Sequence, residues 1–112
     1  MDLVNFPGRD EVWLAALDPV VGSEIRKTRP CLVISPDEAN RGLRTVIVAP
    51  MTTTERPYPT RVRVTFQATQ GQVALDQIRA IDRTRLIRKL GKVSTKTAQT
   101  VSRTLVEMFT RE

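Results

Sequence analysis

The stretch Thr60-Arg61-Val62-Arg63-Val64-Thr65-Phe66 alternates strictly between polar and apolar side chains. Successive side chains of a strand point to opposite faces, so Val62, Val64 and Phe66 share one face and the two arginines share the other. The pattern predicts a β-strand with one face on a core and the other face in solvent.

Apolar runs on both sides of this stretch predict further short strands, over Glu11–Leu17, Cys31–Ser35, Leu43–Pro50, Val73–Leu75, Gln77–Asp82 and Gly91–Val93. The first of them is expected to be mostly buried on both faces, with Trp13 as a core anchor. Pro36–Gly42 is rich in turn-forming residues, a turn is expected at Gln70-Gly71, and the basic segment Arg83–Leu90 is predicted as a helical turn.

Ser94 is a candidate N-cap for a final helix from Thr95 to about Thr110. Its apolar residues recur at helical spacing and give one face: Ala98, Val101, Leu105 and Met108, with Phe109 beside it. Short strands followed by one helix predict a single domain over residues 1–112, a small, mainly antiparallel barrel or strongly curved sheet.

The chain has 18 Lys and Arg against 12 Asp and Glu, which gives a net charge of +6 and favours a polyanionic partner. Most of these cations are arginines, whose planar guanidinium suits phosphate. The basic segment Arg79–Lys96 is either a solvated face or a surface that follows a nucleic-acid backbone. No signal peptide is expected in Met1–Pro7, and the run Val12–Leu17 is far shorter than the ~20 residues of a membrane span, so a cytoplasmic protein is expected.

The chain has no histidine and one cysteine, Cys31, which is expected to be a small buried hydrophobe. These absences exclude histidine acid–base pairs, the usual serine and cysteine triads, and common zinc sites. No run of acidic residues indicates a two-metal nuclease, and no glycine-rich phosphate loop occurs. We therefore expect no cofactor and no metal.

A polar loop, Asp18–Pro30, leads into one predicted strand, and Met51-Thr52 closes the next. If the two strand ends meet, Glu24, Arg29 and Thr52 lie together at one edge of the sheet. Such a group suits RNA cleavage: the carboxylate can accept the 2'-OH proton, the guanidinium can neutralise charge on the phosphate, and the hydroxyl can bind a phosphate oxygen. Taken singly, each is better explained as an ordinary surface or strand-end residue, and only the combination indicates this chemistry.

Four segments, in this order, resemble the successive motifs of the MazF/PemK (Kid) toxins of type II toxin-antitoxin systems: Asp18–Glu24, Arg29–Ser35, Val48–Thr52 and Leu75–Asp82. The resemblance spans Gly8 to Phe109. It implies an SH3-like barrel with a C-terminal helix, a homodimer, and a metal-independent, sequence-specific endoribonuclease (an mRNA interferase). Family members cut single-stranded RNA through 2'-OH attack and leave 2',3'-cyclic phosphate and 5'-OH ends.

The family's catalytic residues fall on Arg29, Thr52 and Glu24. Because arginine stays protonated, we limit Arg29 to charge stabilisation and leaving-group protonation. The loops expected to read RNA are Asp18–Thr28 and Thr53–Pro59, and the side chains expected to contact it are Arg26, Lys27, Thr28, Thr53, Arg56, Arg61 and Arg79. The resemblance also implies a cognate antitoxin whose disordered acidic tail lies across the RNA groove.

The chain departs from the family in two places. Thr28 stands where some relatives have a histidine before the Arg-Pro pair, and Gly8-Arg9-Asp10-Glu11 differs from the usual Gly-Asp start. Two alternatives remain open: a gyrase poison like CcdB, which acts through a C-terminal Trp-Gly-Ile that this chain lacks, and an RNA-binding barrel without catalysis.

Overall fold

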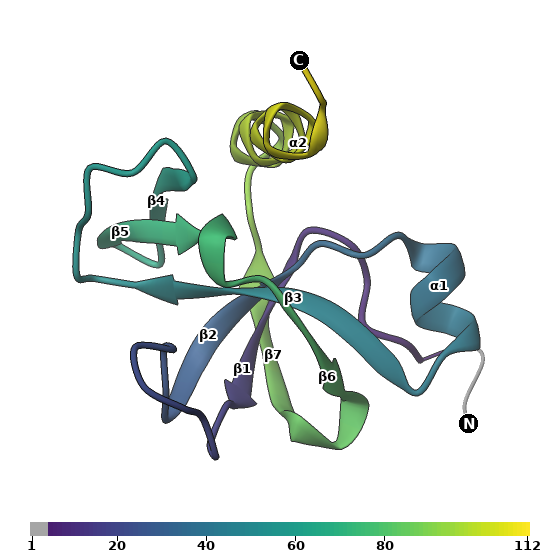
Figure 1. Ribbon diagram of the computed structural model, residues 1–112. Helices are drawn as coiled ribbons and strands as arrows, with labels where there is room; N and C mark the ends of the chain where they lie inside the picture. Colours follow the sequence, from purple (N-terminus) through teal and green to yellow (C-terminus); the bar gives the residue numbers. More distant parts are fainter. Residues whose placement is uncertain (1–4) are drawn as a thin grey trace.

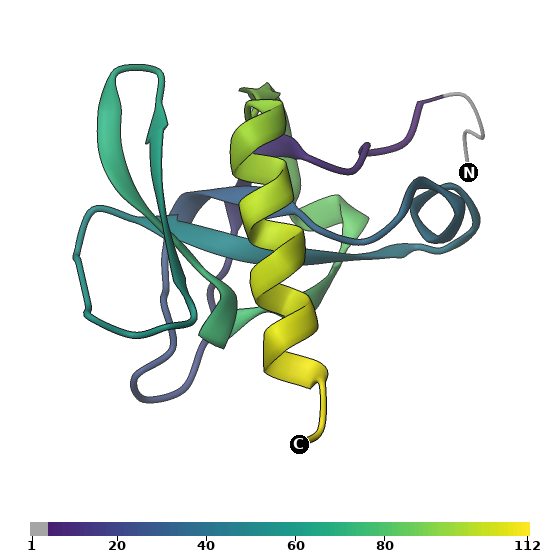
Figure 2. The ribbon, with the colours of Figure 1, turned by 90° about the horizontal axis from the view of Figure 1, so that it is seen from above.

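The computed structural model describes residues 5–112 and shows a strongly curled antiparallel sheet with a helix across one side (Figures 1 and 2). Met1–Val4, part of the stretch in which no signal peptide is expected, lie outside the described residues. The strands are β1 (Glu11–Ala16), β2 (Thr28–Val33), β3 (Thr45–Thr52), β4 (Arg61–Phe66), β5 (Thr69–Ala74), β6 (Arg79–Asp82) and β7 (Leu86–Lys92). The helices are α1 (Asp37–Gly42) and α2 (Thr95–Phe109), with short 3-10 turns η1 (Leu75–Gln77) and η2 (Arg83–Arg85). The predicted class, mainly β with a C-terminal helix, is confirmed.

Strand β3 joins the two halves of the sheet. The hydrogen-bonded order is β4-β5-β3-β2-β1-β7, with β6 also beside β3. The first part of β3 pairs with β2 and β6, whereas Met51 and Thr52 pair with β5. Pro50, which has no N–H to donate, stands where the partner changes. The end of β3 is therefore the place where both halves of the sheet meet.

The apolar runs are continuous because the strands bury side chains on both faces. One core cluster includes Val12, Leu32 and Met51, and α2 packs over it. The second cluster lies on the other face of the same strands and includes Ala15 and Cys31, with Trp13 packed at its margin. Both faces of β1 contribute to a core, as predicted, but only Val12 and Ala15 of the strand are fully buried. The prediction of Trp13 as a core anchor is wrong, because its side chain is half-buried and its N–H donates to the partly exposed Glu11.

Helix α2 begins after Ser94, whose hydroxyl accepts a hydrogen bond from the Thr97 N–H at 3.1 Å. Its apolar face packs against the first cluster through the predicted residues Ala98, Val101, Leu105 and Met108. Phe109, at the end of α2, is 68% exposed. Within residues 5–112, no helix has the length and apolar character needed to cross a membrane.

Cys31 is fully buried, as the sequence predicts. Burial raises the pKa of its thiol to about 12, although the positive charges of Arg79 and Arg29 oppose the shift. The thiol is therefore protonated at neutral pH and acts as a small core side chain.

Two connecting segments differ from prediction. The segment predicted as a helical turn, Arg83–Leu90, makes only the short turn η2 and then continues as β7 on the open edge of β1. Two register shifts in the β1–β7 pairing break the alternation that marks a strand. Three consecutive residues of β7, Ile87, Arg88 and Lys89, are all exposed. Pro36–Gly42, predicted as a turn-rich connection, contains helix α1, with acidic residues in its first turn and Arg41 in its last.

The hairpin between β4 and β5 also differs from prediction. The turn lies at Gln67-Ala68, where both residues have positive φ (49° and 64°), and not at Gln70-Gly71. Strand β5 therefore begins at Thr69, earlier than the predicted Val73. Gly71 lies inside β5, where a Cβ atom would be 2.6 Å from the Thr52 carbonyl oxygen. The glycine permits close approach of β5 to β3.

Candidate active site

Arg29 and Thr52 lie just beyond the last pair of the β2–β3 ladder. That ladder ends at Cys31 and Pro50, two residues from each of them, and Thr52 then pairs with Gln72 of β5. Arg29 lies on β2, which begins at Thr28 and not at the predicted Cys31. The strand begins early because Arg29 and Pro30 are paired with β1. Strand geometry, and not the loop, therefore sets the position of Arg29.

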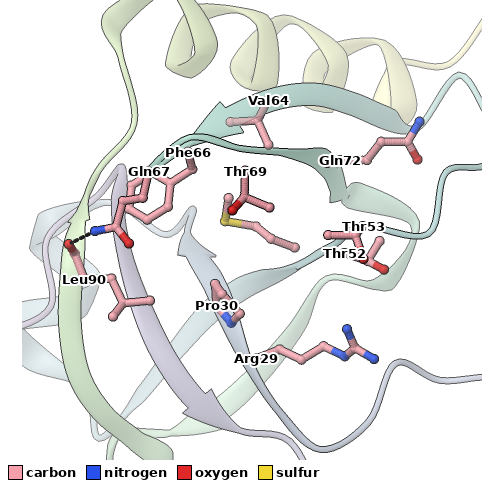
Figure 3. A pocket seen from close by; sticks show the side chains of 12 residues that line it. Arg29, Pro30, Thr52, Thr53, Val64, Phe66, Gln67, Thr69, Gln72 and Leu90 are labelled. Carbon is pink, nitrogen blue, oxygen red and sulfur yellow. Dashed lines mark hydrogen bonds between the residues drawn. The ribbon is translucent and has the colours of Figure 1, made fainter.

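Arg29 and Thr52 line a pocket of about 230 Å³ between β2, β3 and the β4–β5 hairpin. In Figure 3 Arg29 extends from β2 below Thr52 and Thr53, while Phe66 and Leu90 lie toward the other side of the pocket. Apolar side chains make up much of the wall of this pocket, and Arg29, Thr52 and Thr53 lie together on one side of it.

A second, larger pocket of about 560 Å³ shares Arg29 and Thr52 with the first. It collects most of the predicted site residues, namely Glu24, Arg26, Arg29, Thr52, Arg56 and Arg61. Its lining carries these four arginines against the two acids Glu24 and Asp76, so the pocket has a net positive charge suited to a phosphate. The structure thus brings together the three predicted catalytic residues on the wall of one pocket.

The loop before β2 is held by its own hydrogen bonds. Glu24 Oε1 accepts from the Val21 N–H at 2.7 Å, and Arg29 Nε donates to the Arg26 carbonyl at 2.9 Å. Arg26 Nη2 donates to the Gly22 carbonyl at 3.1 Å. Each of these side chains retains further polar atoms that can contact a ligand.

Thr52 is buried, with 8% exposure, and its Oγ1 accepts a hydrogen bond from the Thr54 N–H at 3.1 Å. Because this bond uses the oxygen as an acceptor, the hydroxyl proton remains able to donate. Thr52 can therefore offer a directed O–H to an anion in the pocket.

Two glutamines that the sequence reasoning missed hold the loops around this pocket. Gln72 Oε1 accepts from the Arg56 N–H at 3.0 Å and its Nε2 donates to the Arg56 carbonyl at 3.1 Å. Gln77 Oε1 accepts from the Ile25 N–H at 2.6 Å. A polar residue directly before the apolar run at Val73 is the only sequence signal that marks Gln72.

Arg61, predicted to contact RNA, is engaged by a residue of its own chain. Its Nε and Nη2 donate to the two oxygens of Asp76 at 2.7 and 3.2 Å, and its side chain is 6% exposed. Partial burial raises the pKa of Asp76, but the hydrogen bonds and charge of Arg61, together with the Thr60 hydroxyl, outweigh it and hold the pKa below its ordinary value. The pair fixes the start of β4 beside the pocket.

This pair predicts how stability changes with pH. Because the pKa of Asp76 is lowered in the folded state, its carboxylate stabilises the fold above the ordinary pKa of 3.8 and loses this effect as the pH falls through the lower folded pKa. We expect Asp76→Asn to be less stable than the wild type at pH 7, and the difference to shrink at pH 3. Urea unfolding of both proteins at the two pH values measures the difference in their free energies of unfolding. A difference as large at pH 3 as at pH 7 would contradict the prediction.

The remaining predicted RNA contacts are placed differently. Thr53 lines the smaller pocket, whereas Arg79 lies in a neighbouring pocket with Glu24 and donates to the Leu17 carbonyl at 3.3 Å. Lys27 and Thr28 are exposed but line neither of the two pockets that Arg29 and Thr52 share. Within residues 5–112 no three His, Cys, Asp or Glu side chains are grouped so that they could hold a metal ion.

Comparison with known structures supports the same fold. MazF from Deinococcus radiodurans superposes with a TM-score of 0.82 at 24% identity, covering 93% of this chain and 96% of that one. An endoribonuclease from a mycobacterial species, solved in complex with its cognate antitoxin, has a TM-score of 0.79 at 25% identity and covers 95% and 99%.

Sequence comparison agrees. Endoribonuclease MazF9 of Mycobacterium tuberculosis is 38% identical over 96 residues, which cover 77% of this chain and 81% of that protein. Endoribonuclease EndoA of Bacillus subtilis is 40% identical over 88 residues, covering 73% and 76%. These relatives confirm the predicted enzyme class. A family model for PemK-like, MazF-like toxins of type II toxin-antitoxin systems matches residues 8–109, so the chain belongs to this family.

Proposed function

We propose that this chain is a metal-independent, sequence-specific endoribonuclease toxin, an mRNA interferase that cleaves single-stranded RNA. The observation that carries the proposal is the convergence of Glu24, Arg29 and Thr52 on one cationic pocket. Cleavage proceeds by attack of a ribose 2'-OH on the adjacent phosphorus. The bond from phosphorus to the 5'-oxygen breaks, which leaves a 2',3'-cyclic phosphate and a 5'-OH.

Each of the three side chains has a distinct task in this reaction, and Arg29 is also a candidate proton donor to the leaving group. The free carboxylate oxygen of Glu24 accepts the 2'-OH proton, since its other oxygen is bonded to the Val21 N–H. The Arg29 guanidinium stabilises the charge that grows on the phosphate oxygens, and Thr52 donates its hydroxyl proton to one of them. The leaving 5'-oxygen takes a proton from the Arg29 guanidinium or from water.

The RNA lies along the loops that frame the two pockets. Arg26, Lys27 and Thr28 on one loop, and Thr53 and Arg56 on the other, contact its phosphates and bases. Their exposure supports this role. Arg61 and Arg79 are engaged inside the fold, so their contribution to RNA binding is the positive field of the groove.

The proposed setting is a bacterial cytoplasm, with the toxin acting as a homodimer. A cognate antitoxin neutralises it by laying a disordered acidic tail across the same cationic groove, which the surplus of arginine over acid favours. The solved mycobacterial relative with its antitoxin supports such a partner.

Incubation of the purified protein with a long single-stranded RNA in excess EDTA tests the proposal. We expect discrete cuts at one short sequence, with cyclic-phosphate and 5'-OH ends identified by mass spectrometry of the fragments. Cleavage that requires added Mg²⁺, or 5'-phosphate ends, would contradict the mechanism. RNA binding without any cleavage by folded protein would favour the non-catalytic barrel, and toxicity lost in gyrase mutants would favour the gyrase poison.

A further inference from the structure

We propose that Gln72 is a positioning residue for the reading loop, defined as residues 53–60: it holds the Arg56 backbone and so keeps Arg56, whose guanidinium donates to the Glu55 carbonyl at 3.1 Å, on the wall of the pocket that Arg29 and Thr52 also line. This role rests on the proposed function, since the position of Arg56 matters only if RNA binds across the pocket and is cleaved there.

The contact between Gln72 and Arg56 reproduces one residue pair of an antiparallel sheet. The side-chain amide accepts from the Arg56 N–H at 3.0 Å and donates to the Arg56 carbonyl at 3.1 Å. A paired strand makes the same reciprocal exchange with backbone groups. Gln72 is 5% exposed, so its amide is held in a fixed position by the surrounding sheet. Arg56 is thus attached to the sheet without being part of a strand.

The bonds between Gln72 and Arg56 hold the middle of the reading loop. Its start is held by the bond from the Thr54 N–H to Thr52 Oγ1, and its end by the bond from the Thr60 hydroxyl to Asp76. Residues 55–58 between these points have no regular structure, and at their end the Tyr58 carbonyl accepts from the Arg61 N–H at 3.0 Å. The Gln72 amide fixes Arg56, earlier in that stretch.

Gln72 also connects the loop to the catalytic hydroxyl. It pairs with Thr52 in the β3–β5 ladder, and the absent Cβ of Gly71 lets β5 lie close against the Thr52 carbonyl. Gln72 therefore contacts both Thr52, through the backbone ladder, and Arg56, through its side chain, and so determines the distance between them. Thr52 and Arg56 both line the larger pocket. A phosphate or base that contacts Arg56 is held at a defined distance from the reacting atoms.

The variant Gln72→Met tests this role because methionine keeps the length and flexibility of the side chain but lacks both hydrogen-bonding groups. The matched control is Gln70→Met, the same substitution on the same strand at an exposed residue. We expect Gln72→Met to raise KM roughly tenfold, from the loss of two hydrogen bonds, with kcat nearly unchanged. Cut sites that differ by one base from the preferred sequence are expected to appear.

A double-variant cycle separates positioning from a general loss of stability. In an Arg56→Ala background the backbone contact remains but the guanidinium is gone, so Gln72→Met is expected to change KM by no more than about twofold. Hydrogen exchange followed by NMR is expected to show faster exchange of the Arg56 amide in Gln72→Met, with the Thr54 amide unchanged. The Gln70→Met control is expected to alter none of these readouts.

Three results would overturn the proposal: an unchanged Arg56 exchange rate, a loss confined to kcat, or an undiminished effect in the Arg56→Ala background. If Gln72→Met does not fold, Gln72→Glu replaces it; this variant keeps the acceptor, loses the donor to the Arg56 carbonyl and adds a negative charge, so the Arg56 amide exchange rate, and not KM, is its readout. If the wild-type protein does not cleave RNA, the proposed function fails. The amide exchange and the affinity for an uncleaved single-stranded oligonucleotide then decide the role of Gln72 independently.

Discussion

Arg29→Ala is expected to lower kcat for RNA cleavage by about 10²–10³, the loss seen when one charge-stabilising donor is removed from an active site. Arg29 lines both pockets together with Thr52, whereas the nearby loop cations Arg26 and Arg56 line only the larger one and cannot take over its position. Its side chain is only half-buried, and we expect little change in thermal stability. Single-turnover cleavage of a short RNA that contains the preferred sequence measures the effect.

Two further variants make the Arg29 result specific. Arg29→Lys keeps the charge but loses the planar fork, and it is expected to recover only part of the lost rate. Arg63→Ala removes one positive charge from the exposed face of β4 and is expected to cleave at nearly the wild-type rate. Equal losses for Arg29→Ala and Arg63→Ala would show that net charge, and not a defined site, drives the reaction.

Gly71→Ala is expected to destabilise the protein by about 1–3 kcal/mol, the usual cost of forcing an extra carbon into a filled space. The new Cβ would lie 2.6 Å from the Thr52 carbonyl oxygen and 3.3 Å from its carbon, so β5 and β3 must move apart. Because this displaces Thr52, cleavage by the folded variant is expected to fall by at least about tenfold. Urea unfolding and cleavage at low temperature measure the two effects.

Gly42→Ala is the matched control for this substitution. Gly42 ends α1, and a Cβ at this position meets no atom within 4 Å. We expect its stability and its cleavage rate to match the wild type. If Gly71→Ala were equally neutral, the close approach of β5 to Thr52 would not constrain the site.

The sequence predicts those parts of the fold whose periodicity is undisturbed. Strand β4 and helix α2 follow their patterns because each packs one face on the core, and both end within a residue of prediction. Only the end of β7, at Gly91 and Lys92, falls in a predicted strand; its first part is missed because the bulges in its pairing with β1 break the period, and because it lies at an edge with both faces partly open. Edge strands carry weak apolar signals, so their partners must be known before they can be recognised.

Gly71 shows how a glycine can mislead the prediction of turns. The pair Gln70-Gly71 indicates a turn, but the turn lies at Gln67-Ala68, two residue types that rarely adopt positive φ. The glycine is required by a contact with Thr52, which is distant in sequence. A local pattern cannot distinguish a glycine needed for its own backbone angle from one needed by a neighbouring strand.

The candidate site, too, is only partly predictable from the sequence. The convergence of Glu24, Arg29 and Thr52 follows from motifs at two strand ends, and the structure places all three on one pocket. The residues that hold the loops, Gln72 and Gln77, depend on which loop crosses which strand, so composition and spacing do not reveal them. The engagement of Arg61 by Asp76 is hidden for the same reason.

The separate anchoring of strands and loops has a consequence for evolution. Arg29 is placed by the β1–β2 ladder and Thr52 by the β3–β5 ladder, whereas Arg56 in the reading loop is joined to the sheet by the side chain of Gln72. Substitutions in the loop can accumulate without moving the proposed catalytic pair. Under the proposed function, related toxins can therefore acquire new target sequences while inheriting their chemistry unaltered.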